Sequence, residues 1–513
     1  MKQISLRLIV ASLFCVLAGS QVAPPKNYRI SGVVIDRATG QRLARVRIVM
    51  NPAGDSSKTT ETITSADGQF AFDKVSAGMW SLYAERKGFP RQGFGERPGV
   101  PDSFTQVVAG PEGNSEGLTF PLDAPAVVTG RITDEDGEPV IAALEIIIQL
   151  ETGIHSFQRI RNAATDEQGQ YRIYDLPAVP CYLLAVAPTP PAEDGEQAPP
   201  TFAPTYYANT ADPSAATLLD LQPGREYRAD FVMRRTRGAA IHIEGDLGGN
   251  LAMLSAAGPR GAEVIVGQLD AGEGRSFYNL PPGHYKLTLF DQRTGDHATK
   301  SIEISSSDVT VQAPFRDAPS VTAKVQLVDA DPSLLSKITF YLHADGDYQT
   351  HARTVGADGT VTIPGMTAGR YKFMLATAGV YIKSLTSENG PATDRIIEVP
   401  ETGTVKLKVV VAGDGGEVAG KLRVDGKPVA PVRVVLAPRN GSTNSADYLS
   451  YQTETDGSFR YRSVRPGDYL LFATADWKME FGNPAVLGKY LSAAKAVHVE
   501  PRASIEANLN QVQ

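Results

Sequence analysis

The sequence predicts an all-β protein, a tandem array of about five antiparallel β-sandwich domains. One strand pattern recurs along the 513 residues: a glycine- or proline-centred turn, a spacer, an aromatic residue, and then an apolar residue at every second position. The strands are short and bounded by turn residues, which 48 glycines and 35 prolines readily supply. No segment sustains the periodicity of an amphipathic helix.

The recurring strand gives the number of domains. Its copies are separated by roughly a hundred residues, the size of one small domain. They begin at Gly78, Pro180, Gly283, Gly369 and Gly467. We predict that the aromatic residue of each copy points into a core. These residues are Trp80, Tyr182, Tyr285, Tyr371 and Tyr469.

The second copy of the recurring strand contains Cys181, and the alternation of that strand predicts which way its side chain points. Alternation from Tyr182 places Leu184 and Val186 on the inward face of the strand. Cys181 then faces away from the core. The alternatives for this thiol are an intermolecular disulfide or a bystander role, and we favour the bystander.

Turn signals complete each repeat. Asp-Gly pairs suit tight hairpin turns, because glycine takes a positive φ without steric penalty. They precede the recurring strand at Asp67-Gly68, Asp358-Gly359 and Asp456-Gly457. We place the sandwiches at 26–123, 125–234, 237–316, 319–411 and 415–513, and a mobile proline-rich loop at 188–204.

Residues 1–20 resemble a signal peptide. Lys2 and Arg7 precede an apolar run that ends in small residues at 18–20. This run is shorter than the about 20 residues that span a bilayer. A retained membrane anchor is the alternative. We expect an exported protein, in the periplasm, on the outer-membrane surface or secreted, without a transmembrane segment after signal removal.

Charge and reactive residues exclude several function classes. The net charge of -7 is mild and scattered, whereas nucleic-acid binding requires a basic stripe. Ser115 lies in a Gly-x-Ser-x-Gly match, but between a loop and a strand instead of a strand and a helix. Asp134 and Asp136 are expected to be turn acids. We therefore expect no enzyme, no cofactor, and no catalytic or metal-binding residues.

The repeat resembles a known family. A hairpin Gly-x-Ile/Val-x-Asp-x-x-Gly, then Thr-Asp-x-x-Gly-x-Tyr/Phe, then Pro-Gly-x-Tyr-x-Leu, is similar to the carboxypeptidase regulatory-like domain. The first, second and fifth repeats match best. The resemblance implies a transthyretin-like sandwich, related to carbohydrate-binding-like folds and non-catalytic. The whole chain resembles exported multi-domain proteins of this kind from acidobacteria.

Aromatic residues outside the core positions are the candidate ligand-binding residues. Trp477 follows the last recurring strand in a loop, and Tyr206 and Tyr207 follow the proline-rich loop. Interdomain packing is the alternative role for all three. We expect a non-catalytic binding or scaffold protein for carbohydrate or another extracellular polymer. A structural stalk or adhesin-like spacer, or an accessory subunit with an envelope protein partner, is the alternative.

Overall fold

The computed structural model confirms the all-β array of sandwiches. It describes residues 27–101, 103–151, 155–188, 201–236, 238–245, 247, 251–269, 275–290, 297–313, 318–344 and 351–513. The predicted signal peptide at 1–20 and most of the predicted loop at 188–204 lie outside these residues. Within the described residues, no helix combines the length and apolarity needed to cross a bilayer.

Separate hydrophobic cores follow one another along the chain. They extend over residues 30–122, 126–233, 239–313, 321–411 and 418–507. We name these stretches unit 1 to unit 5. The domain boundaries given above stay a proposal.

Unit 1 consists of two sheets. Its strands are β1 (Tyr28–Asp36), β2 (Arg47–Pro52), β3 (Thr60–Ile63), β4 (Gln69–Val75), β5 (Gly78–Arg86), β6 (Phe89–Gly93), β7 (Val107–Ala109) and β8 (Leu118–Leu122). One sheet has the order β4-β1-β8, and the other β3-β2-β5-β6 with β7 also on β5. Leu82 and Ala84 of the recurring strand β5 lie in the core between the sheets, as predicted.

Unit 2 has two main sheets and a short added pair. Its elements are β9 (Ala126–Asp134), β10 (Ala143–Glu151), β11 (His155–Ala164), β12 (Gln170–Leu176), β13 (Pro180–Val186), β14 (Thr201–Phe202), β15 (Thr205–Tyr206), η1 (Pro213–Ala215), β16 (Leu219–Asp220), β17 (Glu226–Arg228), β18 (Phe231–Met233) and β19 (Arg235–Thr236). The larger sheet runs β11-β10-β13-β15. Because β14 pairs with β19, the ordered chain resumes inside the segment predicted as a mobile loop.

The prediction for the faces of β13 is wrong. Cys181 is fully buried in the unit 2 core, together with Leu183 and Ala185. Tyr182 and Leu184 lie on the opposite face. Cys181 pairs with Ile148 at the hairpin position where Tyr469 pairs with Pro438 in unit 5, so the cysteine occupies the place of the aromatic residue. Alignment on the turn proline shifted the pattern by one residue, which exchanges the two faces of a strand.

Unit 3 packs a three-stranded sheet on a four-stranded one. Its elements are β20 (Ala239–Gly245), β21 (Leu251–Ala257), η2 (Pro259–Gly261), β22 (Glu263–Leu269), β23 (Ser276–Leu280), β24 (Gly283–Phe290), β25 (His297–Ile304) and β26 (Val309–Ala313). The sheets have the orders β23-β20-β26 and β22-β21-β24-β25. Tyr285, Leu287 and Leu289 of β24 enter the core, as predicted.

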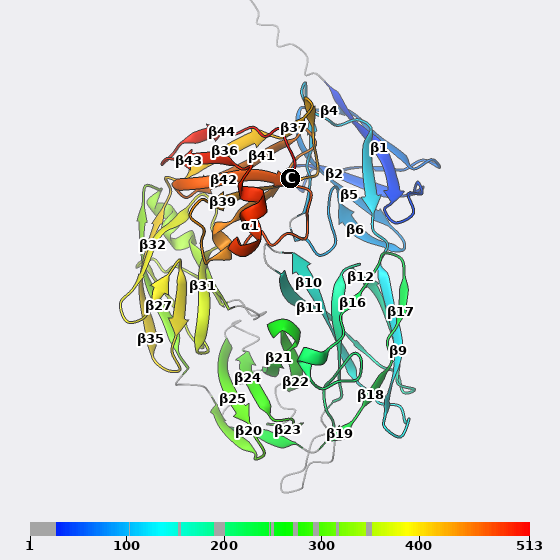
Figure 1. Cartoon of the computed structure of the whole chain (residues 1–513), viewed down its shortest axis with the longest axis vertical. Coiled ribbons are helices and arrows are strands. Elements are labelled where there is room, and N and C mark those ends of the chain that lie inside the picture. The colour runs from blue at the N-terminus through cyan, green and yellow to red at the C-terminus, as the bar shows by residue number, and fades with distance from the viewer. Residues whose placement is uncertain are drawn as a thin grey trace, which may run out of the picture.

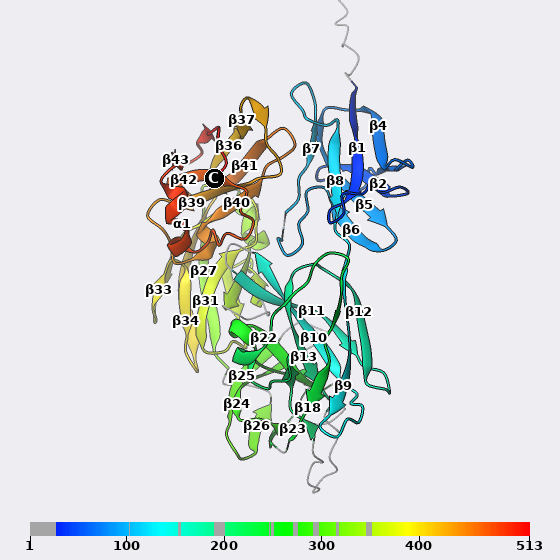
Figure 2. The same ribbon diagram turned by 45° about the vertical axis from the view of Figure 1, so that its right-hand side comes forward.

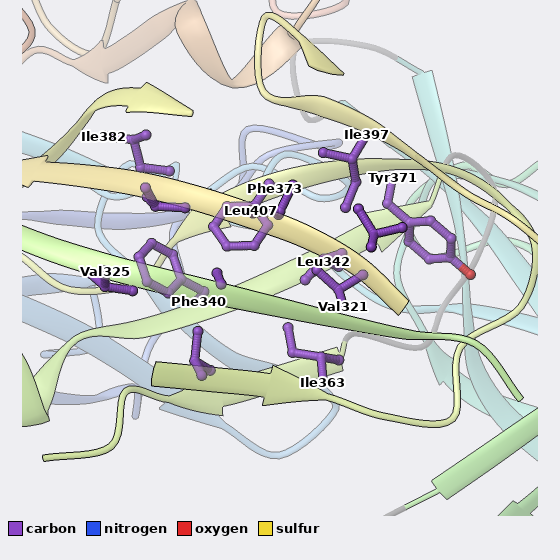
Figure 3. Packing of buried hydrophobic residues seen from close by; sticks show 14 of the residues in the cluster. Val321, Val325, Phe340, Leu342, Ile363, Tyr371, Phe373, Ile382, Ile397 and Leu407 are labelled. Carbon is purple, nitrogen blue, oxygen red and sulfur yellow. The ribbon is translucent and has the colours of Figure 1, made fainter. Parts of the chain in front are cut away.

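Unit 4 shows the sandwich packing in close view (Figure 3). Its elements are β27 (Ser320–Val328), η3 (Pro332–Lys337), β28 (Thr339–Ala344), β29 (His351–Thr354), β30 (Thr360–Ile363), β31 (Gly369–Leu375), β32 (Tyr381–Ser387), β33 (Ala392–Thr393), β34 (Ile396–Val399) and β35 (Thr404–Ala412). Phe340 and Phe373 meet at 4.8 Å between ring centroids. Val321 and Leu407 face them from the other sheet, and all four side chains are buried.

Unit 5 contains the one α-helix among the described residues. Its elements are β36 (Gly416–Lys421), β37 (Arg423–Val424), β38 (Lys427–Pro428), β39 (Arg433–Pro438), η4 (Ser445–Asp447), β40 (Leu449–Gln452), β41 (Ser458–Val464), β42 (Gly467–Thr474), α1 (Pro484–Leu491), β43 (Lys495–Val499) and β44 (Ser504–Glu506). Leu487 and Tyr490 of α1 pack on Val435 and Phe472, on the outer face of the sheet β40-β39-β42-β43. The sheet is therefore buried on both faces.

The first strand of every unit pairs in parallel with a strand near the end of that unit. The parallel pairs are β1–β8, β9–β17 and β9–β18, β20–β26, β27–β35, and β36–β44. All other pairs of the described strands are antiparallel, as the sequence predicts. Alternation reports which face of a strand is buried and carries no information on direction. The parallel pair was therefore not foreseen.

The units follow one another around a closed ring (Figures 1 and 2). Both views place unit 1, in blue, beside unit 5, in orange and red. The backbone N–H of Val108 donates to Thr455 Oγ1 at 2.9 Å, and Gln452 Nε2 donates to the Gly95 carbonyl at 3.0 Å. The first and last units are thus joined by direct hydrogen bonds.

Candidate ligand-binding site

The two candidate tyrosines pack against other side chains of units 2 and 3. Tyr206 is only 3% exposed and lies in an apolar cluster that joins units 2 and 3. The other buried members are Ile147, Tyr182, Leu184, Ala262 and Val264. Tyr207 is half-buried and meets Phe231 of the unit 2 core at 6.0 Å. The geometry of both residues favours the packing alternative over ligand binding.

Trp477 lies at the contact between units 1 and 5. Its loop leaves β42 after Thr474 and is anchored by the buried side chains of Met479 and Phe481 before α1 begins. The indole is half-buried. The guanidinium carbon of Arg97, from unit 1, lies 4.4 Å from the indole centroid, and that of Arg433, in β39, lies 5.1 Å from it. Both distances are in the range of cation–π interactions.

The loop that carries Arg97 is braced within unit 1 and by unit 2. It follows β6, and the Arg97 backbone N–H donates to Ser103 Oγ at 2.8 Å. The Ser103 hydroxyl donates to the Val100 carbonyl at 2.7 Å. The backbone N–H of Glu151, at the end of β10, donates to the Gly99 carbonyl at 2.7 Å. Unit 2 therefore helps to position the arginine against the tryptophan.

A pocket of about 490 Å³ opens where units 1, 2 and 5 converge. Ligand pockets typically have about 300–1,000 Å³. Its wall combines aromatic rings, a guanidinium and carboxyl groups. The lining residues are Val100, Pro101, Ser103, Phe104, Gln106, Glu151, Arg433, Ser450, Tyr451, Gln452, Glu454, Trp477 and Phe481. We call it the junction pocket.

Arg433 is the most unusual residue of the junction pocket. It is a charged side chain with only 3% exposure, in a strand whose neighbouring residues are apolar. Burial lowers the pKa of its guanidinium to about 10, with Arg97 adding repulsion and with Glu151 and Asp476 opposing the shift. Its Nη1 donates to the Trp477 carbonyl at 3.2 Å.

Arg97 is a second cation at the same indole. The side chain is half-buried, and its Nε is buried without a hydrogen-bond partner. Burial and the charge of Arg37 lower its pKa, whereas Asp123 raises it. Among the described residues, no carboxylate oxygen lies within 4.0 Å of the guanidinium of Arg97 or Arg433.

Glu454 forms the polar wall between units 1 and 5. Its carboxyl group accepts from the Tyr451 hydroxyl at 2.6 Å and from the backbone N–H of Gln106. Burial raises its pKa to about 7, although both hydrogen bonds lower it. Glu454 is therefore engaged with the protein and is a poor partner for the two arginines.

The other motifs have structural roles in this fold. The Ser115 hydroxyl donates to the Arg29 carbonyl at 2.8 Å. Asp134 accepts from Arg235 Nη2 at 2.6 Å and from the backbone N–H of Asp136 at 3.0 Å. No group of three or more metal-ligating side chains occurs in the described part of the chain.

Sequence reasoning selected Trp477 and missed its neighbours. Arg97 and Arg433 reach the indole from different units, and Glu454 lines the junction pocket from the loop after β40. One signal was available: Arg433 interrupts the apolar run Val432 to Leu436. A charged residue in a strand that is apolar on both faces indicates a buried polar contact. Nothing in the sequence pattern reports the contact between the first and last units.

Comparison with known proteins supports the fold. The family model of the carboxypeptidase regulatory-like domain matches residues 29–122, so unit 1 is similar to that domain. No curated protein matches the chain.

Solved structures offer only distant likenesses. The TIE protein of Bacillus anthracis is 12% identical, with 76% of this chain and 75% of that chain covered and a TM-score of 0.18. A streptococcal ancillary pilin is 13% identical, with 56% and 100% covered and a TM-score of 0.17. The minor pilin of Streptococcus agalactiae is 12% identical, with 41% and 96% covered and a TM-score of 0.20. These scores are too low to carry an argument about function.

Proposed function

We propose that this chain is an exported, non-catalytic protein that binds carbohydrate or another extracellular polymer in the junction pocket. The observation that carries the proposal is the pocket of about 490 Å³ at the meeting of three units. Binding sites occur preferentially at domain interfaces and combine apolar walls with a few polar groups. Trp477, Phe481 and Phe104 provide such walls here.

Two further features support the proposal. The resemblance of the repeats implies a non-catalytic domain related to carbohydrate-binding folds, and the family match of residues 29–122 agrees with it. The signal-like pattern at 1–20 supports export to the periplasm, the outer-membrane surface or the medium. Fold alone does not determine function, so the argument depends on the pocket.

The alternative proposal is a structural spacer or an accessory subunit that binds a protein partner. An extended stalk gains reach when its units are arranged end to end. The hydrogen bonds between Val108 and Thr455 and between Gln452 and Gly95 hold the first unit against the last instead. This closure favours a binding role over a simple spacer.

The proposal predicts that binding depends on Trp477. We would present the mature chain from Gln21 to a panel of soluble polysaccharides and compare it with the Trp477→Ala variant. Loss of the indole removes a wall of the pocket and the ring that two guanidinium groups contact, so we expect at least a tenfold loss of affinity. Isothermal titration calorimetry measures it.

A matched control separates binding from general surface effects. Tyr174 of β12 is 60% exposed and lies outside the junction pocket, so Tyr174→Ala should bind as the unchanged chain does. Equal binding by Trp477→Ala and the unchanged chain would contradict the proposed site. An absence of binding across the panel would contradict the polymer-binding function.

A further inference from the structure

We infer that the junction pocket selects an acidic saccharide, whose anionic group pairs with Arg433 beside the indole of Trp477, while Arg97, on the same indole but outside the pocket lining, adds longer-range attraction. The shared chemistry is a sugar ring that carries a carboxylate or a sulfate ester. This inference rests on the proposed function. The buried guanidinium and the aromatic rings of the pocket favour an anionic ligand with an apolar face, and the proposed function specifies that this ligand is a sugar.

The first argument is the uncompensated charge of Arg433. Its side chain is 97% buried, because only 3% is exposed. Of the five N–H donors of a guanidinium, one bonds to the Trp477 carbonyl. A buried charge requires a partner of opposite sign, and none of the described carboxylates lies within 4.0 Å. Because Arg433 also lines the junction pocket, a ligand there could supply the anion.

The second argument is the pairing of two cations on one ring. Arg97 and Arg433 both lie over the indole of Trp477, at 4.4 and 5.1 Å from its centroid. The positive charge of Arg97 lowers the pKa of Arg433, because like charges repel. Arg97 also has a buried Nε without a partner. An anion beside Arg433 would relieve this repulsion and supply a partner for the remaining N–H donors of Arg433.

The carboxylates of the pocket do not fulfil this role. Glu454 is occupied by the Tyr451 hydroxyl and the Gln106 backbone. Glu151 accepts from Gln149 Nε2 at 3.1 Å, and Asp476 accepts from the Tyr490 hydroxyl at 3.0 Å. Glu151 and Asp476 favour the charged form of Arg433 only through longer-range attraction. Among the described residues, no carboxylate therefore forms a direct ion pair with Arg433, and an anionic ligand in the pocket can supply one.

The geometry of the groups fits an acidic sugar better than a neutral one. A guanidinium binds a carboxylate or sulfate through two parallel hydrogen bonds. Phe104, Phe481 and Trp477 add aromatic carbon to the lining of the same pocket, with the Arg433 guanidinium 5.0 Å from the Phe481 centroid and Phe104 stacked on Tyr83. A neutral sugar would fill the apolar part and leave Arg433 buried without a counter-charge.

The test compares oligosaccharides that differ only in charge. Trigalacturonate, a sulfated galactotriose and neutral galactotriose are titrated into the mature chain by calorimetry. Intrinsic fluorescence of a Trp80→Phe background reports on Trp477 directly, because the chain has only two tryptophans. We expect at least about tenfold tighter binding of an acidic trisaccharide than of the neutral one, and weaker binding at high salt. The two acidic ligands distinguish carboxylate from sulfate.

Variants test the two arginines separately. Arg97→Gln should weaken binding of the acidic trisaccharide about threefold and change binding of the neutral one little, because Arg97 acts on the anion only through longer-range attraction. Arg433→Lys keeps the charge but not the fork of donors, and should lose affinity as well. Arg228→Gln is the control, since that arginine side chain is 75% exposed and belongs to unit 2, away from the pocket. Thermal melting checks that each variant is folded.

The outcomes separate this inference from the proposed function. Tighter acidic binding that a folded Arg433→Lys variant loses, with binding of the neutral trisaccharide kept, supports the inference. Binding of neutral and acidic trisaccharides with equal affinity, lost in Trp477→Ala, would overturn the inference and leave the proposed function standing. An absence of binding by all three ligands and by the polysaccharide panel would overturn both.

Discussion

Glu454 places a carboxyl group between the last unit and the first. Its side chain is 3% exposed, and it accepts from a backbone N–H of the other unit. Burial favours the neutral form, which raises the pKa to about 7 from the ordinary value of 4.5. The junction between units 1 and 5 therefore contains a group that titrates near neutral pH.

The stability of this junction should decrease as the pH rises. Between pH about 4.5 and about 7, the folded protein holds a proton on Glu454 that the unfolded chain releases, so the free energy of unfolding falls with pH. The full change is roughly 3 kcal/mol. Glu454→Gln keeps a neutral side chain and should remove this dependence. Differential scanning calorimetry should show that the variant gains stability relative to the unchanged chain when the pH is raised from 5 to 8.

An equal difference in stability between Glu454→Gln and the unchanged chain at pH 5 and pH 8 would contradict the raised pKa of Glu454. Glu112 provides a control carboxyl at the same contact, since it is exposed and pairs with Lys421 at 2.9 Å. The pKa of Glu112 is lowered by that bond. Glu112→Gln should therefore not reproduce the gain at pH 8.

Single glycines determine how closely the first strand of a unit approaches its neighbours. A Cβ on Gly130 would overlap the Ala229 carbonyl oxygen, and Gly32 and Gly420 have the same constraint against Leu118 and Ala507. The Tyr171 hydroxyl donates to that Ala229 carbonyl, which fixes its position. The opening glycine of the repeat thus reflects close backbone approach.

Gly130→Ala should destabilise unit 2 by about 2 kcal/mol, a typical result of overpacking. The added methyl group meets backbone that is held in the sheet and cannot move aside without losing hydrogen bonds. Calorimetry of the full chain measures the loss. Gly283→Ala is the control, because a Cβ there meets no atom closer than 3.6 Å. An equal loss in both variants would indicate a general cost of replacing strand glycines.

At the scale of elements, the sequence predicted the strands well and one orientation badly. Alternation placed the core residues of β24 correctly, because one face of that strand lies in a core and the other carries Lys286 and Thr288. In β13 both faces are buried, one in unit 2 and one against unit 3. A strand that is apolar on both faces carries no alternation signal, so a single turn residue decided the register and decided it wrongly.

Closure of the ring is a property of the whole molecule. Thr105 is fully buried, and its hydroxyl accepts from Gln452 Nε2 at 2.6 Å and donates to the Thr453 carbonyl at 3.3 Å. These contacts join residues about 350 positions apart. Figure 2 shows the two units side by side. The junction pocket exists only while this contact is made.

Thr105→Trp should open the ring. The large side chain cannot fit between the two units, while the cores of both units are left unchanged. We expect a larger radius of gyration by small-angle X-ray scattering, with an unchanged far-ultraviolet circular dichroism spectrum, and loss of any ligand bound in the junction pocket. Thr60→Trp, at an exposed position of β3 in the same unit, is the control. An unchanged radius of gyration would contradict closure through this contact.

The sequence by itself determined the class of this protein: repeated short strands, turns rich in glycine and proline, and one aromatic residue per repeat at the start of a core strand. These features follow from local rules, because alternation and turn chemistry act over a few residues. It also selected Trp477 as a residue outside the core. The tertiary structure alone decided that Arg97 and Arg433 meet that indole. Their encounter depends on contacts between units far apart in the chain, which no local pattern encodes.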